Sequence, residues 1–187
     1  MTILYIKNMV CNRCIMVVRN ELDRLGYKVI NVKLGEVTLD KEITAVEKKH
    51  IDDILIPYGF QLIDDKKSRI IEKVKNTIVD LVHLHDNNIQ TNLSDVLSDA
   101  LHLDYKYLSN IFSEVEGTTI EKYFIAHKIE KVKELLVYDE LSLSEIALRL
   151  NYSSVAYLSN QFKKVTGLTP SHFKQVGENK RKPLDQV

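Results

Sequence analysis

An internal repeat in the C-terminal half of this 187-residue chain constrains its fold more than any other sequence feature. The six residues YLSNIF at 107–112 return as YLSNQF at 157–162, at an offset of 50 residues. The same offset relates further pairs on both sides, namely Leu93 and Leu143, Ser94 and Ser144, Gly117 and Gly167, and Thr119 and Thr169. A repeat that aligns without a gap over this length indicates two copies of one supersecondary unit.

The second copy of the repeat has the pattern of a helix followed by a sharp turn. Its apolar residues Leu158, Phe162 and Val165 are spaced four and three apart, so they are expected to share one helix face. Gly167 is expected to end this helix, because Gly adopts the left-handed conformation of a C-terminal cap without steric cost. Polar residues occupy the remaining face, which suits a helix that lies against nucleic acid.

Residues that cap free backbone N–H groups mark the predicted helix starts. Thr169 is a predicted N-cap, and capping boxes are predicted for Thr118 with Glu121 and for Ser142 with Glu145. A long helix that begins at Thr118 separates the two copies. The pattern therefore predicts two helix-turn-helix units joined by one long helix. A helical protein-interaction module is the alternative interpretation of the same pattern.

The N-terminal part has a different pattern, in which apolar segments of strand length and helix length alternate. The predicted elements are strands at 2–8, 27–34, 36–39 and 60–63 and helices at 15–25 and 44–56. Their order is that of the split βαβ, or ferredoxin-like, arrangement. The predicted fold class is therefore α+β, with a ferredoxin-like βαββαβ module followed by an all-α double helix-turn-helix domain.

A short charged stretch is the predicted junction between the two domains. Residues 64–68 read DDKKS and contain no apolar side chain. This junction gives an N-terminal domain at residues 1–64 and a helix-turn-helix domain at residues 65–176. Residues 177–187 are expected to form a basic, disordered tail.

Charge is distributed unevenly along the chain although the net charge is zero. Residues 65–141 carry 10 Lys/Arg against 14 Asp/Glu, whereas residues 142–187 carry 7 against 3. The second repeat copy and the tail are therefore the electropositive part. No apolar run is long enough to span a bilayer and no signal peptide is recognisable, so a cytoplasmic protein with reduced thiols is expected.

The chain's two cysteines, Cys11 and Cys14, lie between the first predicted strand and the first predicted helix. At a helix N-terminus, the helix dipole and the neighbouring Arg13 favour the thiolate form. The pair has three interpretations: a metal site, a redox pair, or two small buried side chains. As metal ligands, two soft sulfurs suit Cu(I) or another thiophilic ion better than zinc, which takes four ligands.

The segment NMVCNRC at residues 8–14, on a βαββαβ module, resembles the heavy-metal-associated domain of copper chaperones and metal-transporting ATPases. The motif of that family is Gly-Met-x-Cys-x-x-Cys, and Gly59 with the aromatic residue after it matches the family's Gly-Tyr pair before the last strand. The resemblance covers residues 1–64. It implies Cys11 and Cys14 as metal ligands and Met9 as a buried anchor of the loop.

Two residues of this segment bear on the match. Asn8 stands where the family has Gly, which is a departure at the start of the loop. Val10 precedes the first Cys, where zinc-preferring members of the family often place an acidic residue. The resemblance therefore favours a monovalent soft ion such as Cu(I) as the bound metal.

The repeat region resembles the DNA-binding domain of AraC/XylS-type transcription regulators. The residues that carry the resemblance are SEIA at 144–147, LNYSS at 150–154, YLS at 157–159, FKK at 162–164, Gly167 and the pair Thr169 and Pro170. The resemblance covers residues 66–176 and implies a seven-helix domain whose two recognition helices enter successive major-groove segments on one face of DNA. Asn151 replaces the family's turn Gly and is expected to keep the turn, because Asn tolerates the left-handed conformation.

The resemblance also implies which side chains touch DNA. The base-reading positions fall on Lys106, Ser109 and Asn110 in the first copy and on Val155, Ala156, Ser159 and Asn160 in the second. An Asn side chain can pair with adenine, and apolar side chains can meet a thymine methyl group. Lys163 and Lys164 suit phosphate contacts. Glu114 and Glu116 make the first copy acidic, so weaker phosphate contacts are expected there.

These features predict a sequence-specific DNA-binding transcription regulator, with gating by a thiophilic metal ion at Cys11 and Cys14 as a further hypothesis. As alternatives, the N-terminal module dimerises the chain through the 27–40 hairpin or senses redox state. A metal carrier or a thiol oxidoreductase is the alternative from another class. The helical repeats argue against a carrier, which needs no DNA-binding module. A thioredoxin-type enzyme usually needs a cis-Pro opposite the thiols, and the only proline of the N-terminal module is Pro57. No catalytic motif stands out, so no enzymatic activity is expected. The expected partners are double-stranded DNA, RNA polymerase and a second copy of the chain, with no membrane partner.

Overall fold

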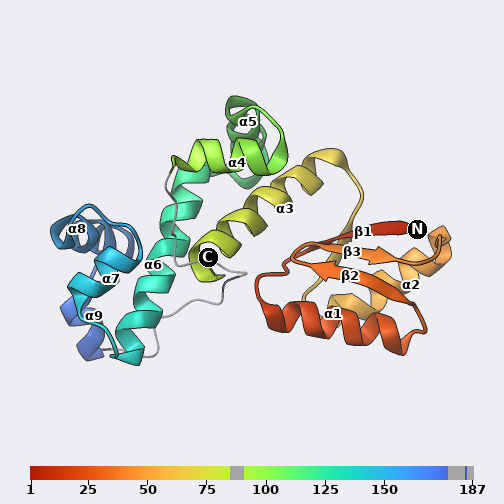
Figure 1. Ribbon diagram of the computed structural model, residues 1–187, viewed down its shortest axis with the longest axis horizontal. Helices are drawn as coiled ribbons and strands as arrows, with labels where there is room; N and C mark the ends of the chain where they lie inside the picture. Colours follow the sequence, from red (N-terminus) through yellow and green to blue (C-terminus); the bar gives the residue numbers. More distant parts are fainter. Residues whose placement is uncertain (85–90, 177–183, 185–187) are drawn as a thin grey trace. The chain divides into compact units, whose positions relative to one another are not determined.

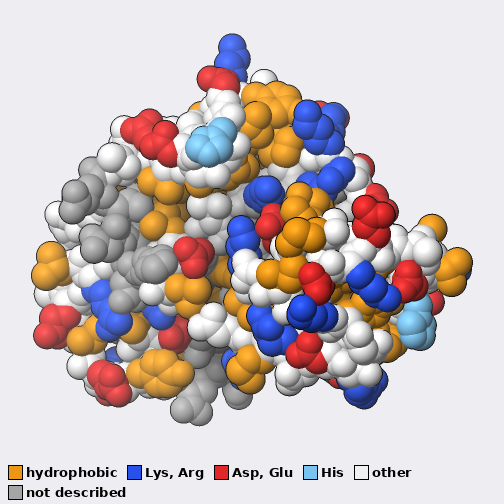
Figure 2. Space-filling model, turned by 45° about the vertical axis from the view of Figure 1, so that its right-hand side comes forward, with side chains coloured by type: hydrophobic (Ala, Val, Ile, Leu, Met, Phe, Trp, Pro, Cys, Tyr) orange, Lys and Arg blue, Asp and Glu red, His pale blue; other side chains and the backbone are white. Residues whose placement is uncertain are grey.

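The computed structural model describes residues 1–84, 91–176 and 184, and it divides into two compact units, Met1–Asn76 and Thr77–Val187 (Figure 1). None of the described helices is long and apolar enough to cross a membrane. On the face shown in Figure 2, lysine and arginine side chains are interspersed with acidic and hydrophobic ones. Except for Leu184, the tail predicted at 177–187 lies outside the described residues.

The first unit contains a four-stranded antiparallel sheet with the strand order β2-β3-β1-β4. Its elements are, in chain order, β1 (Thr2–Lys7), α1 (Asn12–Arg24), β2 (Val29–Lys33), β3 (Glu36–Leu39), α2 (Ala45–Leu55), the 3₁₀ turn η1 (Ile56–Tyr58) and β4 (Gln61–Ile63). The two central strands, β1 and β3, are thus not consecutive in the chain. This arrangement confirms the predicted ferredoxin-like βαββαβ module.

Alternation along β1 separates the two faces of the sheet. Leu4 and Ile6 are at most 1% exposed and belong to the core that α1 and α2 cover. Tyr5 lies between them in sequence and therefore points to the opposite face. Met9, just after the strand, is also fully buried in this core, as the resemblance implied.

The helix α3 (Lys66–Val79) covers part of the opposite face of the sheet. The guanidinium carbon of Arg69 lies 4.9 Å from the ring centroid of Tyr5. Farther along the helix, Asn76 packs so closely on Gly35 that a Cβ atom there would lie 2.1 Å from the Asn76 amide nitrogen. The sequence predicted the junction at residues 64–68, whereas the two compact units divide between Asn76 and Thr77, inside α3.

The second unit repeats one arrangement of helices. The π-helical turn η2 (Asp80–Leu84) follows α3, and the later helices are α4 (Leu93–Leu101), α5 (Tyr105–Glu116), α6 (Ile120–Tyr138), α7 (Leu143–Arg149), α8 (Val155–Thr166) and α9 (Pro170–Val176). The starts of α4 and α7, of α5 and α8, and of α6 and α9 are each 50 residues apart. The predicted pair of helix-turn-helix units is therefore confirmed, and α6 joins them (Figure 1).

The core of the second copy includes only part of the apolar face of α8. Leu158 and Phe162 are fully buried in it, but Val165 is 47% exposed. The three residues share one face of α8, as predicted, but the buried part of that face ends before Val165. The aromatic ring that α9 brings to this end of the core, Phe173, packs on Phe162 at 5.5 Å between ring centroids, and Val165 in the last turn stays outside that contact.

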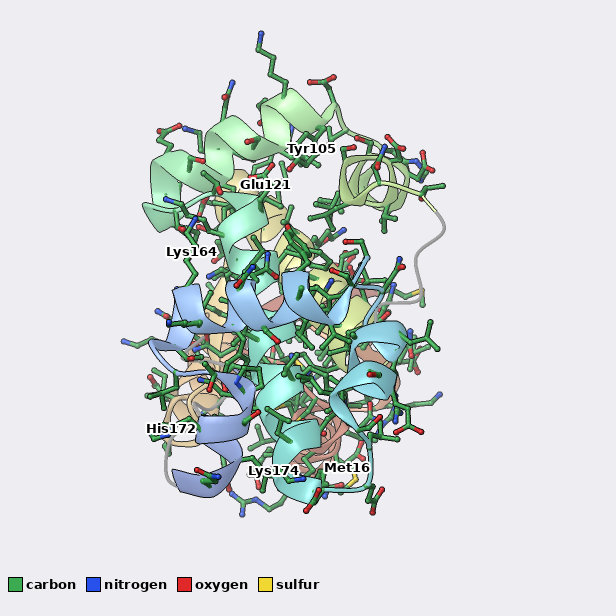
Figure 3. The ribbon with its side chains drawn as sticks, turned by 90° about the vertical axis from the view of Figure 1, so that its left-hand side faces the viewer. Met16, Tyr105, Glu121, Lys164, His172 and Lys174 are labelled. Atoms are coloured by element: carbon green, nitrogen blue, oxygen red, sulfur yellow. The ribbon has the colours of Figure 1, made fainter. Side chains whose placement is uncertain are left out.

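The N-cap of α6 differs from the one predicted. Thr119, not Thr118, is the N-cap, and its hydroxyl accepts a hydrogen bond from the backbone N–H of Lys122 at 3.2 Å. Glu121 instead accepts a hydrogen bond from the hydroxyl of Tyr105, the first residue of α5, and the labels of these two residues lie close together in Figure 3. The repeat contained the missed signal, because Thr119 lies 50 residues before the predicted cap Thr169.

The other two predicted caps are present. Ser142 and Glu145 form a capping box, in which the carboxylate of Glu145 accepts the Ser142 N–H at 2.7 Å and the Ser142 hydroxyl accepts the Glu145 N–H at 3.3 Å. At the start of α9, the hydroxyl of Thr169 accepts the N–H of His172 at 3.3 Å. These contacts need only three or four consecutive residues, which is why local sequence predicts them well.

Candidate nucleic-acid interface and cysteine site

A tight turn sets the angle between α7 and α8. Asn151 adopts the left-handed conformation, with φ of 54°, as expected for the residue that replaces a turn glycine. The backbone N–H of Tyr152 then donates to the carbonyl of Ala147 at 2.8 Å. Ser154 caps α8 by accepting the N–H of Tyr157 at 3.1 Å. The start of the second recognition helix is therefore held by the turn and by its own cap.

Tyr152 connects α8 to the long helix α6. It is 8% exposed, and its hydroxyl donates to the side-chain oxygen of Gln161 in α8 at 2.8 Å. The ammonium of Lys128 in α6 lies 3.8 Å from the centroid of the Tyr152 ring. Burial raises the pKa of Tyr152 and lowers the pKa of Lys128 to about 8. A buried cation over an aromatic ring thus fixes the second helix-turn-helix unit against α6.

The outer face of α8 carries most of the predicted DNA-binding residues of the second copy. Ala156, Asn160, Lys163 and Lys164 are exposed, and their spacing of four, three and one places them on one side of the helix. Two further predicted positions, Val155 and Ser159, are half-buried; Val155 also packs against the core. The exposed row combines an amide with two cations, which suits base and phosphate contacts respectively.

The outer face of α5 carries the predicted residues of the first copy. Lys106 and Asn110 are exposed and Ser109 is half-buried. α5 and α8 are spaced along α6 and run in roughly the same direction, as Figure 3 shows with Tyr105 at the start of α5 and Lys164 near the end of α8. The two copies therefore present corresponding faces of their second helices.

The charges on the two faces differ at corresponding positions. Exposed Glu114 in α5 lies 50 residues before exposed Lys164 in α8. Tyr107 and Tyr157, also 50 residues apart, are 42% and 54% exposed on the two helices, although they were not among the predicted interface residues. Their repetition at a position that the core does not use was the signal in the sequence, because a large aromatic residue that stays exposed is available for contact.

The cysteine pair lies at the start of α1 in the first unit. Cys11 is the N-cap residue of α1, and the Sγ atoms of Cys11 and Cys14 are 3.4 Å apart. Both side chains are partly exposed. Asn8 takes a positive φ of 70° and its side-chain amide donates to the carbonyl of Gly59 at 2.9 Å. Asn8 thereby adopts a conformation that Asn tolerates well and ties the cysteine loop to the residue after η1.

The two thiols have different acidities. Partial burial raises the pKa of Cys14, and the neighbouring Cys11 raises it further. At Cys11 the same desolvation is outweighed by hydrogen bonds from the backbone and side chain of Cys14, with help from Arg13, so the pKa of Cys11 is lowered. Cys11 is therefore the more acidic thiol of the pair.

The donor set fits a soft ion of low coordination number. Two thiols face each other at 3.4 Å and remain accessible. Among residues 1–84, 91–176 and 184, no group of three His, Cys, Asp or Glu side chains is arranged to hold a metal. Tetrahedral zinc needs four ligands, whereas a thiophilic monovalent ion accepts two sulfurs.

Comparison with known proteins concerns mainly the second unit. Residues 97–175 match a protein-family model described as a helix-turn-helix domain. The chain is 27% identical over 154 residues to the xylose operon regulatory protein of Escherichia coli K12, and 30% identical over 107 residues to the HTH-type transcriptional regulator YfiF of Bacillus subtilis. These alignments cover 82% and 57% of this chain but 37% and 33% of the relatives, so the chain spans about a third of their length.

A solved structure agrees with the fold of this region. The C-terminal domain of AraT, a response regulator from Geobacillus stearothermophilus, superposes with a TM-score of 0.51 at 23% identity. The superposition covers 64% of this chain and 95% of that domain. Together with two helix-turn-helix units at a constant offset of 50 residues, these matches assign the second unit. The C-terminal half of the chain therefore contains a helix-turn-helix domain.

Proposed function

We propose that this protein binds double-stranded DNA sequence-specifically through α5 and α8 and regulates transcription. The observation that carries the proposal is the row of exposed side chains on α8, in which Asn160 lies beside Lys163 and Lys164. The capped, turn-fixed start of α8 presents this row on a rigid element. The similarity to regulators of transcription supports the same function.

Base reading is tested with Asn160→Ala on a DNA site selected by the wild-type protein. The exposed amide can form two hydrogen bonds with one adenine. Its loss is expected to weaken binding by about 1–3 kcal/mol and to relax the preference at one base pair. Asn20→Ala, which removes an exposed asparagine from α1 in the first unit, is the matched control. If Asn160→Ala bound every sequence as the wild type does, the assignment of base reading to this residue would be wrong.

Phosphate contact is tested with Lys164→Ala. A lysine that neutralises one phosphate contributes about one unit to the slope of log affinity against log salt concentration. The variant is expected to bind all sequences more weakly and to lower that slope by about 1. Lys49→Ala removes an exposed lysine from α2 and is the control, with an unchanged slope expected.

The finer proposal is that a thiophilic ion, with Cu(I) favoured, binds Cys11 and Cys14 and changes the affinity for DNA. Its support is the pair of accessible thiols 3.4 Å apart, one of them with a lowered pKa. A redox signal at the same thiols is the competing form of this proposal. The exposed edge strand β2 also allows the module to pair with a second copy, which would leave the thiols without a regulatory role.

The gating experiment measures the DNA affinity of reduced protein with and without one equivalent of Cu(I), and repeats it with Cys11→Ser/Cys14→Ser. A cysteine-dependent change of about tenfold, equivalent to about 1.4 kcal/mol of coupling, is the expected result. Equal affinity of the apo, metal-loaded and oxidised forms would refute gating without affecting DNA binding itself. Sedimentation of the same samples tests pairing through β2.

A further inference from the structure

A cavity on the open face of the sheet is lined by none of the residues assigned above to DNA contacts or to the cysteine site. It has a volume of about 300 Å³, lies wholly within the first unit, and is lined by Tyr5, Lys66, Arg69, Ile70 and Lys73. Four of these residues follow the spacing of three, four and seven along α3, so they form one stripe of the helix. Three of the five lining residues are cations, which makes the cavity strongly basic.

The central cation of this group is held in place. The Arg69 guanidinium lies 4.9 Å from the Tyr5 ring centroid, and its Nε donates to the backbone carbonyl of Asp65 at 3.4 Å. The Lys73 ammonium lies 5.5 Å from the same ring. Because Tyr5 belongs to the central strand β1, which pairs with a strand on each side, its ring has a fixed position beneath both cations. The Arg69 guanidinium and the Lys73 ammonium therefore share one aromatic ring on the sheet.

Nearby carboxylates leave a positive excess in the cavity. Glu36 is the carboxylate beside Lys73, at 3.7 Å, and it also pairs with Lys33 at 3.4 Å. The carboxylate of Asp65 is turned toward the start of α3, where it accepts the backbone N–H of Ser68 at 2.8 Å.

The other two cations of the cavity are not neutralised in this way. Across the described part of the chain, neither Lys66 nor Arg69 has a carboxylate oxygen within 4.0 Å. An anion that entered the cavity would therefore meet two cations that are not engaged in ion pairs, in addition to Lys73.

We propose that this cavity binds a small organic phosphate, in the form of a phosphate monoester dianion. One guanidinium fork and two ammonium groups supply the donors that phosphate oxygens accept, and Arg provides the directional pair. A volume of 300 Å³ is at the lower end of the range for small-molecule sites, which fits a compact ligand. Ile70 supplies an apolar wall for the organic part.

A phosphate of duplex DNA is the other anion that such a cluster could meet. The concave shape, the aromatic floor and the half-buried Arg69 favour a small ligand over the backbone of a wide duplex. Contacts to a duplex backbone use side chains that reach outward, as Lys163 and Lys164 do on α8. The site does not depend on the proposed DNA-binding function, because binding of the small anion is measured without DNA.

The test is a titration of the full chain, without DNA and at about 0.15 M ionic strength, with phenyl phosphate. Amide resonances of residues around Tyr5 and Ile70 report the binding site, and calorimetry reports the affinity. Arg69→Met is expected to weaken binding about tenfold or more, and Arg69→Lys is expected to recover part of the loss. Lys49→Met removes an exposed cation from α2 in the same unit and should change affinity less than about twofold.

The outcomes separate the proposal from its competitors. Saturable binding that requires Arg69 and not Lys49 supports a phosphate site in the cavity. Absence of binding, or equal weakening by both substitutions, overturns it, because the latter means unspecific attraction to charge. Binding of succinate without phenyl phosphate contradicts the phosphate assignment. If Arg69→Met weakens binding of random duplex DNA while phenyl phosphate does not bind, the cluster is a DNA contact and the proposal is wrong.

Discussion

At the scale of single residues, Lys128 shows how aromatic packing lets a charge lie in a protein interior. It is 7% exposed, and its ammonium lies 3.8 Å from the Tyr152 ring centroid and 5.6 Å from that of Phe124. Burial lowers its pKa to about 8 from an ordinary value of 10.5. Two ring contacts offset part of the desolvation, each by about 0.5–2 kcal/mol, and the lowered pKa means that a net cost remains.

Lys128→Met is expected to raise the free energy of unfolding at pH 7 by about 1 kcal/mol, because it keeps the packing and removes the desolvation cost. Between pH 8 and pH 10.5, Lys128 of the wild type is mostly deprotonated in the native state and mostly protonated in the unfolded state. The free energy of unfolding of the wild type therefore rises with pH in this range relative to that of the variant. Tyr152 is present in both proteins, and its raised pKa lowers their stability only near pH 10 and above, beyond the pH values compared. Denaturant unfolding at pH 7 and pH 9 measures both effects, with exposed Lys122→Met as the control. If the unfolding free energies of wild type and Lys128→Met differed by the same amount at both pH values, the lowered pKa of Lys128 would be contradicted.

Asn151 is the residue whose backbone conformation keeps the second turn. With φ of 54°, replacement by Ala is expected to cost about 1–2 kcal/mol of unfolding free energy, since a Cβ without a polar side chain is strained there. Asn151→Gly is expected to change stability by less than about 0.5 kcal/mol. Thermal unfolding of both variants measures the difference. Equal destabilisation by Ala and Gly would mean that the side chain, rather than the backbone, holds the turn.

At the scale of elements, the start of α6 separates two adjacent threonines with different roles. Thr119→Ala is expected to cost about 1 kcal/mol, because the Lys122 N–H loses its acceptor at 3.2 Å. Thr118→Ala, at the position first predicted to cap, is expected to change stability by less than about 0.5 kcal/mol. Chemical denaturation of the two variants is a matched comparison. If Thr118→Ala lost more stability than Thr119→Ala, the originally predicted capping box of Thr118 with Glu121 would be supported instead.

At the scale of the whole molecule, the two copies share a helix plan and differ in charge. Glu114 in α5 occupies the position of Lys164 in α8. If both helices face DNA, Glu114→Lys is expected to tighten binding at low salt and to increase the salt slope by about 1, since it adds one phosphate contact. Filter binding or fluorescence anisotropy over a salt series measures this. An unchanged slope would mean that the first copy stays away from the DNA backbone.

The sequence alone determined the elements of both units and most of the second one in detail. The 50-residue offset, the caps at Ser142 and Thr169 and the left-handed turn at Asn151 all depend on contacts within a few residues. Such hydrogen bonds and backbone preferences depend only on a few neighbouring residues, so they can be predicted without knowing the fold. The apolar periodicity likewise predicted the buried Leu158 and Phe162.

Only the tertiary structure decided which surfaces the elements cover. Val165 follows the same periodicity as Phe162 yet stays exposed, because the ring of Phe173 from another helix packs on Phe162 instead. The basic cavity at Arg69 exists because α3 lies over Tyr5, a residue 64 positions earlier in the chain. Contacts of this kind depend on how distant segments meet in space, and no local pattern of propensity or hydrophobicity encodes that meeting.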